Sequence, residues 1–336
     1  MRIAFVLYPE VIISNRSNGI RSQAESWCRS LTSLGHDVVL VNNWGDYDWS
    51  SFDAVHLFGM GNSGTWMTDV AKRMYALNSN LFFSPIIDPL PLKMIPLKEK
   101  TSMLAKVIFP SLAKITKQKI KMFKKVFVRS ECEKDYLIKY WGLDCARIAV
   151  VPLAFSPNYE NQEYNAKRQN FCLHISSLYQ PRKNVVRLIK AAQKYQFELV
   201  LAGNPGSNEQ FDPIKQAIGD SKNIHVLGYI SENEKFRLYN TARVFALPSI
   251  QEGVGIVAVD AAVMGCEIAI TNIAGPKDYY NSMAQEVNPY DVDSIGKCIL
   301  SLLEQEKINQ PKLKKYIEEH YSSLCIGKKI VEAYKK

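Results

Sequence analysis

The chain has 336 residues, of which 47% are hydrophobic and 22% are charged, a composition typical of globular proteins long enough for two domains. No run of about 18 apolar residues predicts a membrane span, and the start lacks the longer apolar stretch of a signal peptide. The seven cysteines are scattered without a CxxC pair. They argue against a zinc site or disulfide framework and favour reduced thiols in a cytoplasmic protein.

The formal net charge of +9 is concentrated in one segment. Residues 91–127 hold ten lysines and one acidic residue, Glu99, and so account for the whole excess. Lysines and apolar residues alternate there, a pattern that fits an interfacial helix or loop on an anionic membrane. Two other interpretations stay open: an amphipathic helix packed on its own sheet with solvated lysines, and RNA binding, which the scarcity of aromatic residues disfavours.

In the first half, strand and helix patterns alternate. Apolar and β-branched runs predict strands at 2–8, 37–41, 54–58, 81–84, 126–129 and 148–151. Helical spacing predicts helices at 20–34, 65–77 and 132–140, and Gly35 is the expected end of the first. Because helix-length segments separate the strands, we expect a parallel, doubly wound sheet.

A polar segment at 156–170 is interpreted as a linker, after which the alternation restarts. Strands are expected at 171–176, 197–202, 223–227, 244–247 and 267–271. Helices are expected at 184–195, 233–240 and 255–264, and near 292–304 and 310–335. Two α/β halves result, and ligands of such proteins bind in the crevice at the carboxyl ends of the strands.

The strongest candidate site is a loop and helix that follow the strand ending at Leu247. The loop carries Glu252 and two glycines, which let main chain approach a ligand closely, and the helix start favours a diphosphate. Asp260 lies within this otherwise apolar helix, where a carboxylate needs a polar partner. Vicinal ribose hydroxyls are one such partner. The alternative is a surface Asp on an amphipathic helix after a flexible glycine loop.

A second candidate is the cation pair Arg182-Lys183. Both residues fall at the expected start of a helix, where the dipole disfavours cations. A bound phosphate between the two side chains and the helix end would explain them. A solvated basic turn is the alternative.

These segments resemble the retaining family 4 glycosyltransferases of the GT-B fold, glycosyl transferases group 1, of the bacterial polysaccharide type. The stretch from Glu252 to Asp260 is similar to the family's Glu-x7-Glu signature, with Asp in place of the second Glu. The stretch from Ser176 to Asn184 is similar to its phosphate-binding turn. Further similarities are LVLAG at 199–203, NIHVLGY at 223–229, NIAGPKDY at 272–279, VNPYD at 287–291, Asn18-Gly19 and Gly35-His36-Asp37.

Two further places depart from the family pattern. The family usually has an Arg five or six residues before Lys183, where this chain has Leu178 and Ser177, so Arg182 is the residue that compensates. Asp88 lies where members often carry His-Asp, and Ile87 occupies the place of the His.

The resemblance implies a GT-B protein with two Rossmann-like domains. Residues 1–157 would bind the acceptor, residues 168–318 would bind the donor, and a helix at 319–336 would return to the first domain. The implied reaction moves a sugar, with retention, from a nucleotide-diphosphate sugar to a glycan or lipid-linked acceptor in cell-surface polysaccharide or glycolipid synthesis. Attack is at the front face, assisted by a donor phosphate oxygen, with no cofactor and no essential metal.

The resemblance also implies roles for residues. Glu252 would contact the donor sugar, Asp260 the ribose, and Arg182 and Lys183 the phosphates. The remaining implied donor-site residues are Gly253, Val254, Gly255, Ile256, Val257, Ser177, Gly203 and Tyr229. On the acceptor side the implied residues are Asn18, Gly19 and Asp88. None of the five histidines has metal-ligand spacing.

A cytoplasmic protein, peripheral on the inner face of the cell membrane through residues 91–127, follows from this interpretation, with no nucleic-acid partner. Two alternatives stay open. One is a nucleotide-sugar or membrane-surface binding subunit with an impaired site, which the absent His, Ser177 and Asp260 favour. The other is a non-hydrolysing nucleotide-sugar epimerase, whose own acid and His pattern is not evident.

Overall fold

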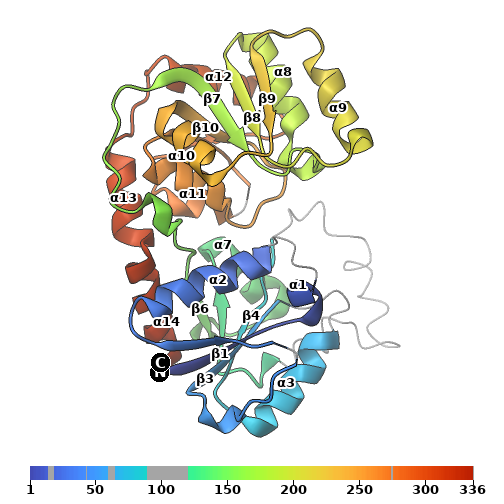
Figure 1. Ribbon diagram of the computed structural model, residues 1–336, viewed down its shortest axis with the longest axis vertical. Coiled ribbons are helices and arrows are strands. Elements are labelled where there is room, and N and C mark those ends of the chain that lie inside the picture. Colours follow the sequence, from blue (N-terminus) through green and yellow to red (C-terminus); the bar gives the residue numbers. More distant parts are fainter. Residues whose placement is uncertain (14–18, 43, 60–64, 89–119, 274, 336) are drawn as a thin grey trace. The chain divides into compact units, whose positions relative to one another are not determined.

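The computed structural model describes residues 1–13, 19–42, 44–59, 65–88, 120–273 and 275–335 (Figure 1). The chain forms two compact units. Unit 1 comprises residues 1–154 and 321–336, and unit 2 comprises residues 155–320. Acceptor binding by the first and donor binding by the second stay predictions. Most of the basic segment, through residue 119, lies outside the described residues.

Unit 1 is built on a six-stranded sheet in the order β2-β1-β3-β4-β5-β6. All its neighbouring strands are parallel, and Phe5 of β1 lies opposite His56 of β3. The strands are β1 (Arg2–Leu7), β2 (Asp37–Leu40), β3 (Ala54–Phe58), β4 (Leu81–Ser84), β5 (Lys125–Val128) and β6 (Ile148–Val150). The doubly wound sheet expected of the first half is confirmed.

The helices of unit 1 come from both ends of the chain. They are α1 (Pro9–Ile13), α2 (Gly19–Thr32), α3 (Thr65–Leu77), α7 (Glu131–Tyr136) and α14 (Ser323–Lys335). Helix α14 packs beside α2 (Figure 1). Buried His56 links α14 to the sheet, because its Nδ1 lies 2.7 Å from Tyr334 Oη and its Nε2 lies 2.8 Å from Ser84 Oγ.

Unit 2 also has a six-stranded sheet, but its strand order is different: β12-β11-β10-β7-β8-β9. Its neighbouring strands are also parallel, and Leu173 of β7 lies opposite Val200 of β8. The strands are β7 (Gln169–Ile175), β8 (Leu199–Ala202), β9 (Ile224–Gly228), β10 (Ala242–Leu247), β11 (Glu267–Thr271) and β12 (Gln285–Val287). The helices are α8 (Val185–Tyr195), α9 (Asn208–Ile218), α10 (Glu232–Thr241), α11 (Ile256–Val263), α12 (Val292–Leu303) and α13 (Lys312–Tyr321).

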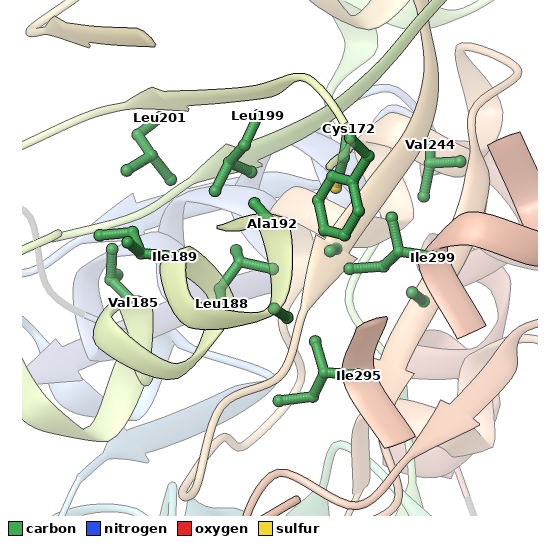
Figure 2. Close-up of a cluster of buried hydrophobic side chains, with 14 of the residues drawn as sticks. Cys172, Val185, Leu188, Ile189, Ala192, Leu199, Leu201, Val244, Ile295 and Ile299 are labelled. Atoms are coloured by element: carbon green, nitrogen blue, oxygen red, sulfur yellow. The ribbon is translucent and has the colours of Figure 1, made fainter. Parts of the chain in front are cut away.

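A hydrophobic core fills the space between this sheet and helices α8 and α12 (Figure 2). Helix α8 has apolar residues at 185, 188, 189 and 192, the spacing that places them on one face. This face meets Leu199 and Leu201 of β8 and Ile295 and Ile299 of α12. Burying each large side chain contributes about 1.5–3 kcal/mol. The core holds the carboxyl ends of β7, β8 and β10 in place.

Some elements differ from the sequence expectation. The single helix expected at 310–335 is wrong: α13 ends at Tyr321 and α14 begins at Ser323. Between them, Ser322 Oγ accepts a hydrogen bond from Cys325 N over 3.4 Å, which caps the new helix. Helix α1, helix α9 and strand β12 were not predicted. In α9, Ile214 is buried and Phe211, Ala217 and Ile218 are partly buried, so the sequence held a short apolar face at helical spacing that was overlooked.

Within the described ranges, no helix is both long and apolar enough to cross a membrane.

Candidate functional site

The predicted ligand-binding loops of unit 2 meet at the carboxyl edge of its sheet. Strands β7 and β10 are parallel neighbours in the sheet, so the turn after β7 and the loop after β10 emerge side by side. Ile250 N donates a hydrogen bond to Arg182 O over 2.8 Å, which joins the loop to the turn. The turn contains a short 3-10 helix, η5 (Pro181–Lys183), placed directly before α8.

A buried ion pair connects these two segments. Lys183 Nζ donates to Glu252 Oε2, and Ser249 Oγ donates to the same oxygen over 3.3 Å. Each charged side chain is only 10% exposed. The phosphate expected between the cations and the helix start is not needed to explain Lys183, because Glu252 is its partner in this structure.

Arg182 lies on the open side of this pair. Its side chain is 39% exposed, and its Nη1 lies 3.9 Å from Glu252 Oε1. Its Nε donates to Gln180 Oε1 over 2.9 Å, and its Nη1 donates to Gln251 O over 3.3 Å. Two cations and one carboxylate leave a net charge of +1 at this edge. Such an edge suits an anionic ligand.

Asn184 completes the turn and was missed by the sequence analysis. Its backbone is left-handed, with φ of 62°, a conformation that Asn tolerates better than most residues. Its side-chain Nδ2 donates to Pro248 O over 2.9 Å and to Pro289 O over 2.6 Å. Asn184 therefore ties the start of α8 to two other loops at the carboxyl edge. An Asn between the cation pair and a helix was the signal available in the sequence.

Gly203, at the end of β8, permits a close approach to β7. Its φ is +114°, and a Cβ at this position would lie 2.0 Å from Ser176 O. No side chain larger than hydrogen fits without moving main chain. Ser177, the next residue in the turn, is half-buried, and its carbonyl accepts from Gln180 N over 3.0 Å.

His174 lies beneath this turn, fully buried on β7. Its Nδ1 lies 2.8 Å from Ala246 O and its Nε2 lies 2.7 Å from Ser176 Oγ. Because a carbonyl can only accept, Nδ1 carries the proton, and neutral Nε2 accepts from the Ser176 hydroxyl. Burial, and secondarily the charge of Lys183, lowers the pKa of His174 to about 4. The histidine is thus a core residue whose two ring nitrogens both have partners.

The glycine loop continues into α11 as expected. Gly255 caps the helix with φ of +69°, and a Cβ there would lie 2.7 Å from Leu247 Cδ2. Gly253 and Val254 are buried, whereas Ile256 and Val257 are half-buried. Tyr229 is 74% exposed and directly follows β9, the edge strand of the sheet.

Asp260 lies in the middle of α11 and is 7% exposed. The alternative of a surface Asp is therefore wrong. Asp260 Oδ1 accepts a hydrogen bond from Ser156 N over 2.9 Å. The polar partner that a buried carboxylate requires is thus supplied, at least in part, by the chain itself.

In unit 1, Asp88 belongs to a second charged cluster. Arg129 Nη2 lies 3.2 Å from Asp88 Oδ1 and donates to Ile87 O over 2.8 Å. Arg129 Nε also donates to Glu133 Oε2 over 3.1 Å, and Glu133 Oε1 accepts from Ile87 N over 2.8 Å. The side chains of Arg129 and Glu133 are 7% and 1% exposed, and that of Asp88 is 34% exposed.

This cluster follows β4 and β5, at the carboxyl edge of the sheet. Ile87, which stands in the place of the family's His, contributes main-chain groups to it. Gly19 is the first residue of α2, whereas Asn18 lies outside the described residues.

A search of the described residues finds no group of His, Cys, Asp and Glu side chains placed to hold a metal ion. A cavity of about 300 Å³ lies in unit 2 between β11, the 3-10 helix η6 (Gly275–Tyr279) and β12. None of its lining residues belongs to the predicted site. The charged edge between the turn after β7 and the loop after β10 is therefore the better candidate.

The sequence of unit 2 matches a known protein family. Residues 156–322 match the model of glycosyl transferases group 1. Over 202 residues the chain is 26% identical to O-antigen chain mannosyltransferase B of Escherichia coli. This match covers 54% of this chain and 52% of that protein. It is 26% identical over 204 residues to O-antigen chain mannosyltransferase RfbU of Salmonella typhimurium, covering 60% and 56% of the two chains. The chain thus matches about half the length of these curated relatives.

Solved structures share the fold along the whole chain. A sucrose-phosphate synthase from Thermosynechococcus elongatus superposes with a TM-score of 0.76 at 12% identity, covering 100% of this chain and 98% of that one. Anabaena HepE in complex with UDP and glucose superposes with a TM-score of 0.71 at 14% identity, covering 100% and 99%. Together with the two parallel sheets, these neighbours confirm the expected GT-B fold.

Proposed function

The chain belongs, through residues 156–322, to the glycosyl transferases group 1 family, and on this premise we propose that it transfers a sugar from a nucleotide-sugar donor to a glycan or lipid-linked acceptor. The setting we propose is the synthesis of a cell-surface polysaccharide. Mannose is the first sugar to test, because both curated relatives named above are called O-antigen chain mannosyltransferases.

The buried pair between Lys183 and Glu252 is the observation that carries this proposal. A buried ion pair is weak evidence for stability, because desolvation offsets most of its attraction. Its position at the carboxyl edge, next to a glycine loop and a helix start, is suited to a ligand instead. In the proposed complex, Lys183 and Arg182 contact the donor diphosphate and Glu252 contacts the sugar.

Catalysis then consists mainly of positioning and of stabilising the leaving group. As the bond to the sugar breaks, negative charge grows on the diphosphate, and the two fixed cations stabilise it. The net charge of +1 at this edge already favours the anion before the reaction starts. We propose that transfer retains the anomeric configuration and requires no metal ion.

The test compares matched variants in a transfer assay with GDP-, UDP- and ADP-sugars, first GDP-mannose, and p-nitrophenyl α-mannoside as the acceptor probe. Glu252→Gln and Lys183→Ala should each lower the rate by about 100-fold or more. Exposed charges of the same unit give the controls Glu232→Gln and Lys190→Ala, which should leave the rate unchanged. Unchanged transfer in Glu252→Gln would refute the assignment.

The same assay separates the alternatives. Donor interconversion without an acceptor would indicate an epimerase, and nucleotide binding without turnover would indicate a binding subunit. The anomeric form of the product, observed by NMR, tests retention. Undiminished transfer in excess EDTA would support a reaction without metal.

We also propose that the basic segment 91–127, apart from residues 125–127 in strand β5, docks on an anionic membrane, where each lysine contributes about 1 kcal/mol near the surface. The support is the charge of residues 91–127, ten lysines against one acidic residue. Sedimentation with phosphatidylglycerol vesicles at low salt should recover the protein with the lipid. Failure to bind would exclude this role.

A further inference from the structure

In the proposed nucleotide site of unit 2, Asp260 is bound by main chain from the start of the unit. Unit 1 ends at Ala154 and unit 2 begins at Phe155, so Ser156 stands at the start of the second unit, next to the connection with the first. Its N–H donates to Asp260 Oδ1 over 2.9 Å although the two residues are 104 positions apart. The signature acid is therefore held by the first residues of unit 2.

This first segment is itself fixed by a buried tyrosine. Tyr159 lies in the 3-10 helix η4 (Pro157–Tyr159) and is 1% exposed. Its ring packs edge-to-face on Tyr239 of α10, with centroids 5.6 Å apart. Tyr239 packs in turn on Phe245 of β10. Tyr159, three residues after Ser156, thus anchors this segment to the sheet of unit 2.

Both tyrosines lie close enough to the Asp260 carboxylate to interact with it electrostatically. Burial first, and then the negative charge of Asp260, raises the pKa of Tyr159 and of Tyr239. Both phenols therefore stay neutral. The negative charge next to them is offset in part by the Ser156 N–H, because a hydrogen bond to an ionised acceptor is about twice as strong as a neutral one.

The Ser156 N–H donates to one oxygen, Oδ1, of this carboxylate. An ionised carboxyl group has about four acceptor positions, so hydroxyl donors of a ribose can share it with Ser156. Asp has one methylene less than the Glu of the family signature, and its carboxylate lies nearer to the helix axis. Its direction then depends on what holds it, and Ser156 N is a donor that does so.

We propose that the main-chain amide of Ser156 is a positioning group for the nucleotide site: it holds the Asp260 carboxylate in the direction that accepts the ribose hydroxyls of a nucleoside diphosphate. This inference rests on the proposed function. It makes donor binding sensitive to the conformation of the chain where the two units join.

Ser156→Pro tests the amide directly. Ser156 has φ of −63°, close to the value that proline requires, so proline fits the main chain but has no N–H. Ser156→Ala is the matched control, because it keeps the N–H and removes a hydroxyl that makes no helix-capping bond. Binding of GDP and UDP is compared by calorimetry with binding of their 2′-deoxy forms.

The wild type should prefer the ribonucleotide by about tenfold. Ser156→Pro and Asp260→Ala should lose most of this preference by weakening ribonucleotide binding alone, whereas Ser156→Ala should keep it. A full preference in Ser156→Pro, or a loss in Ser156→Ala, would overturn the inference. A wild type that binds no nucleotide would instead refute the proposed function.

Hydrogen exchange in the wild type gives a second test that needs no variant. Binding of GDP should slow exchange in the peptide covering 155–160 by about tenfold, because a ribose-bound carboxylate no longer releases the Ser156 N–H. Unchanged exchange at saturating GDP would also overturn the inference.

Discussion

Each unit has a six-stranded parallel sheet, but the two units build their charged edges differently. In unit 1, Arg129 and Glu133 are four residues apart, and their charges are satisfied largely by each other and by nearby main chain. In unit 2, Lys183 and Glu252 are 69 residues apart and join two loops. The pair of unit 1 lies within one loop and helix and contacts the loop after β4 through Ile87 and Asp88. The pair of unit 2 itself joins the turn after β7 to the loop after β10. This is why we locate the donor chemistry in unit 2.

The comparison is open to experiment because the five tryptophans (27, 44, 49, 66 and 141) all lie in unit 1. Their fluorescence follows the unfolding of unit 1 alone, and far-UV circular dichroism follows both units.

The largest expected effect on the free energy of unfolding comes from replacing a glycine that follows a strand and has positive φ. Gly203→Ala places a Cβ 2.0 Å from the carbonyl oxygen of Ser176, and main chain must move. We expect a loss of about 5 kcal/mol, enough to unfold unit 2, from strain and overpacking together. The measurement is urea unfolding followed by circular dichroism.

Gly59→Ala in unit 1 is the matched control. Its φ is also positive, +78°, but the contacting atom at 2.7 Å is the end of the flexible Ile20 side chain. A cost of only about 1–2 kcal/mol is expected. Equal losses in the two variants would show that the close approach at Ser176 does not limit residue choice.

The second-largest expected effect on the free energy of unfolding comes from breaking the buried ion pair of unit 1. Glu133→Gln leaves the buried Arg129 guanidinium without its main charge partner, and we expect unit 1 to lose about 4 kcal/mol. Tryptophan fluorescence during urea unfolding measures it. Glu131→Gln, on the same helix, breaks the pair with Lys134, whose side chains are 24% and 62% exposed. That control should cost less than about 1 kcal/mol, and a similar cost for both would contradict the role of burial.

The smallest expected effect is the change with pH that His174 makes to the stability of unit 2. The pKa of His174 is lowered from 6.5 to about 4, so the unfolded chain takes up a proton first as the pH falls. Stability is therefore lost between pH 6.5 and pH 4, by roughly 3 kcal/mol in total, and is fully present above this range.

His174→Asn isolates this contribution, because the amide N–H can still donate to Ala246 O but does not titrate. The difference in unfolding free energy between variant and wild type, followed by circular dichroism, should change across that range in favour of the variant. His225→Asn, at an exposed position, should run parallel to the wild type. If the unfolding free energies of His174→Asn and the wild type changed in parallel with pH, His174 would not be a buried neutral histidine.

Much of the site was predictable because its signals are local. Gly253 and Gly255 after a strand, the cation pair before a helix, and Asp260 in an apolar helix are patterns within a few residues, and each lies in the predicted element. What the sequence missed was remote or weak. Asn184 contacts Pro248 and Pro289, and no local rule connects these three residues. Helix α9 has apolar residues at helical spacing, with Ile214 buried and Phe211 and Ile218 partly buried, but the pattern is short and Pro213 interrupts it.

By itself, the sequence determined the alternation of strands and helices, hence the parallel sheets, because apolar periodicity records which faces are buried. It also determined which residue types stand at the strand ends. The tertiary structure alone decided their partners: Lys183 with Glu252, Asp260 with Ser156, and His56 with Tyr334 of the last helix. The physical reason is that these bonds join positions 69, 104 and 278 residues apart. Such contacts depend on how strands order themselves in a sheet, which no short stretch of sequence encodes.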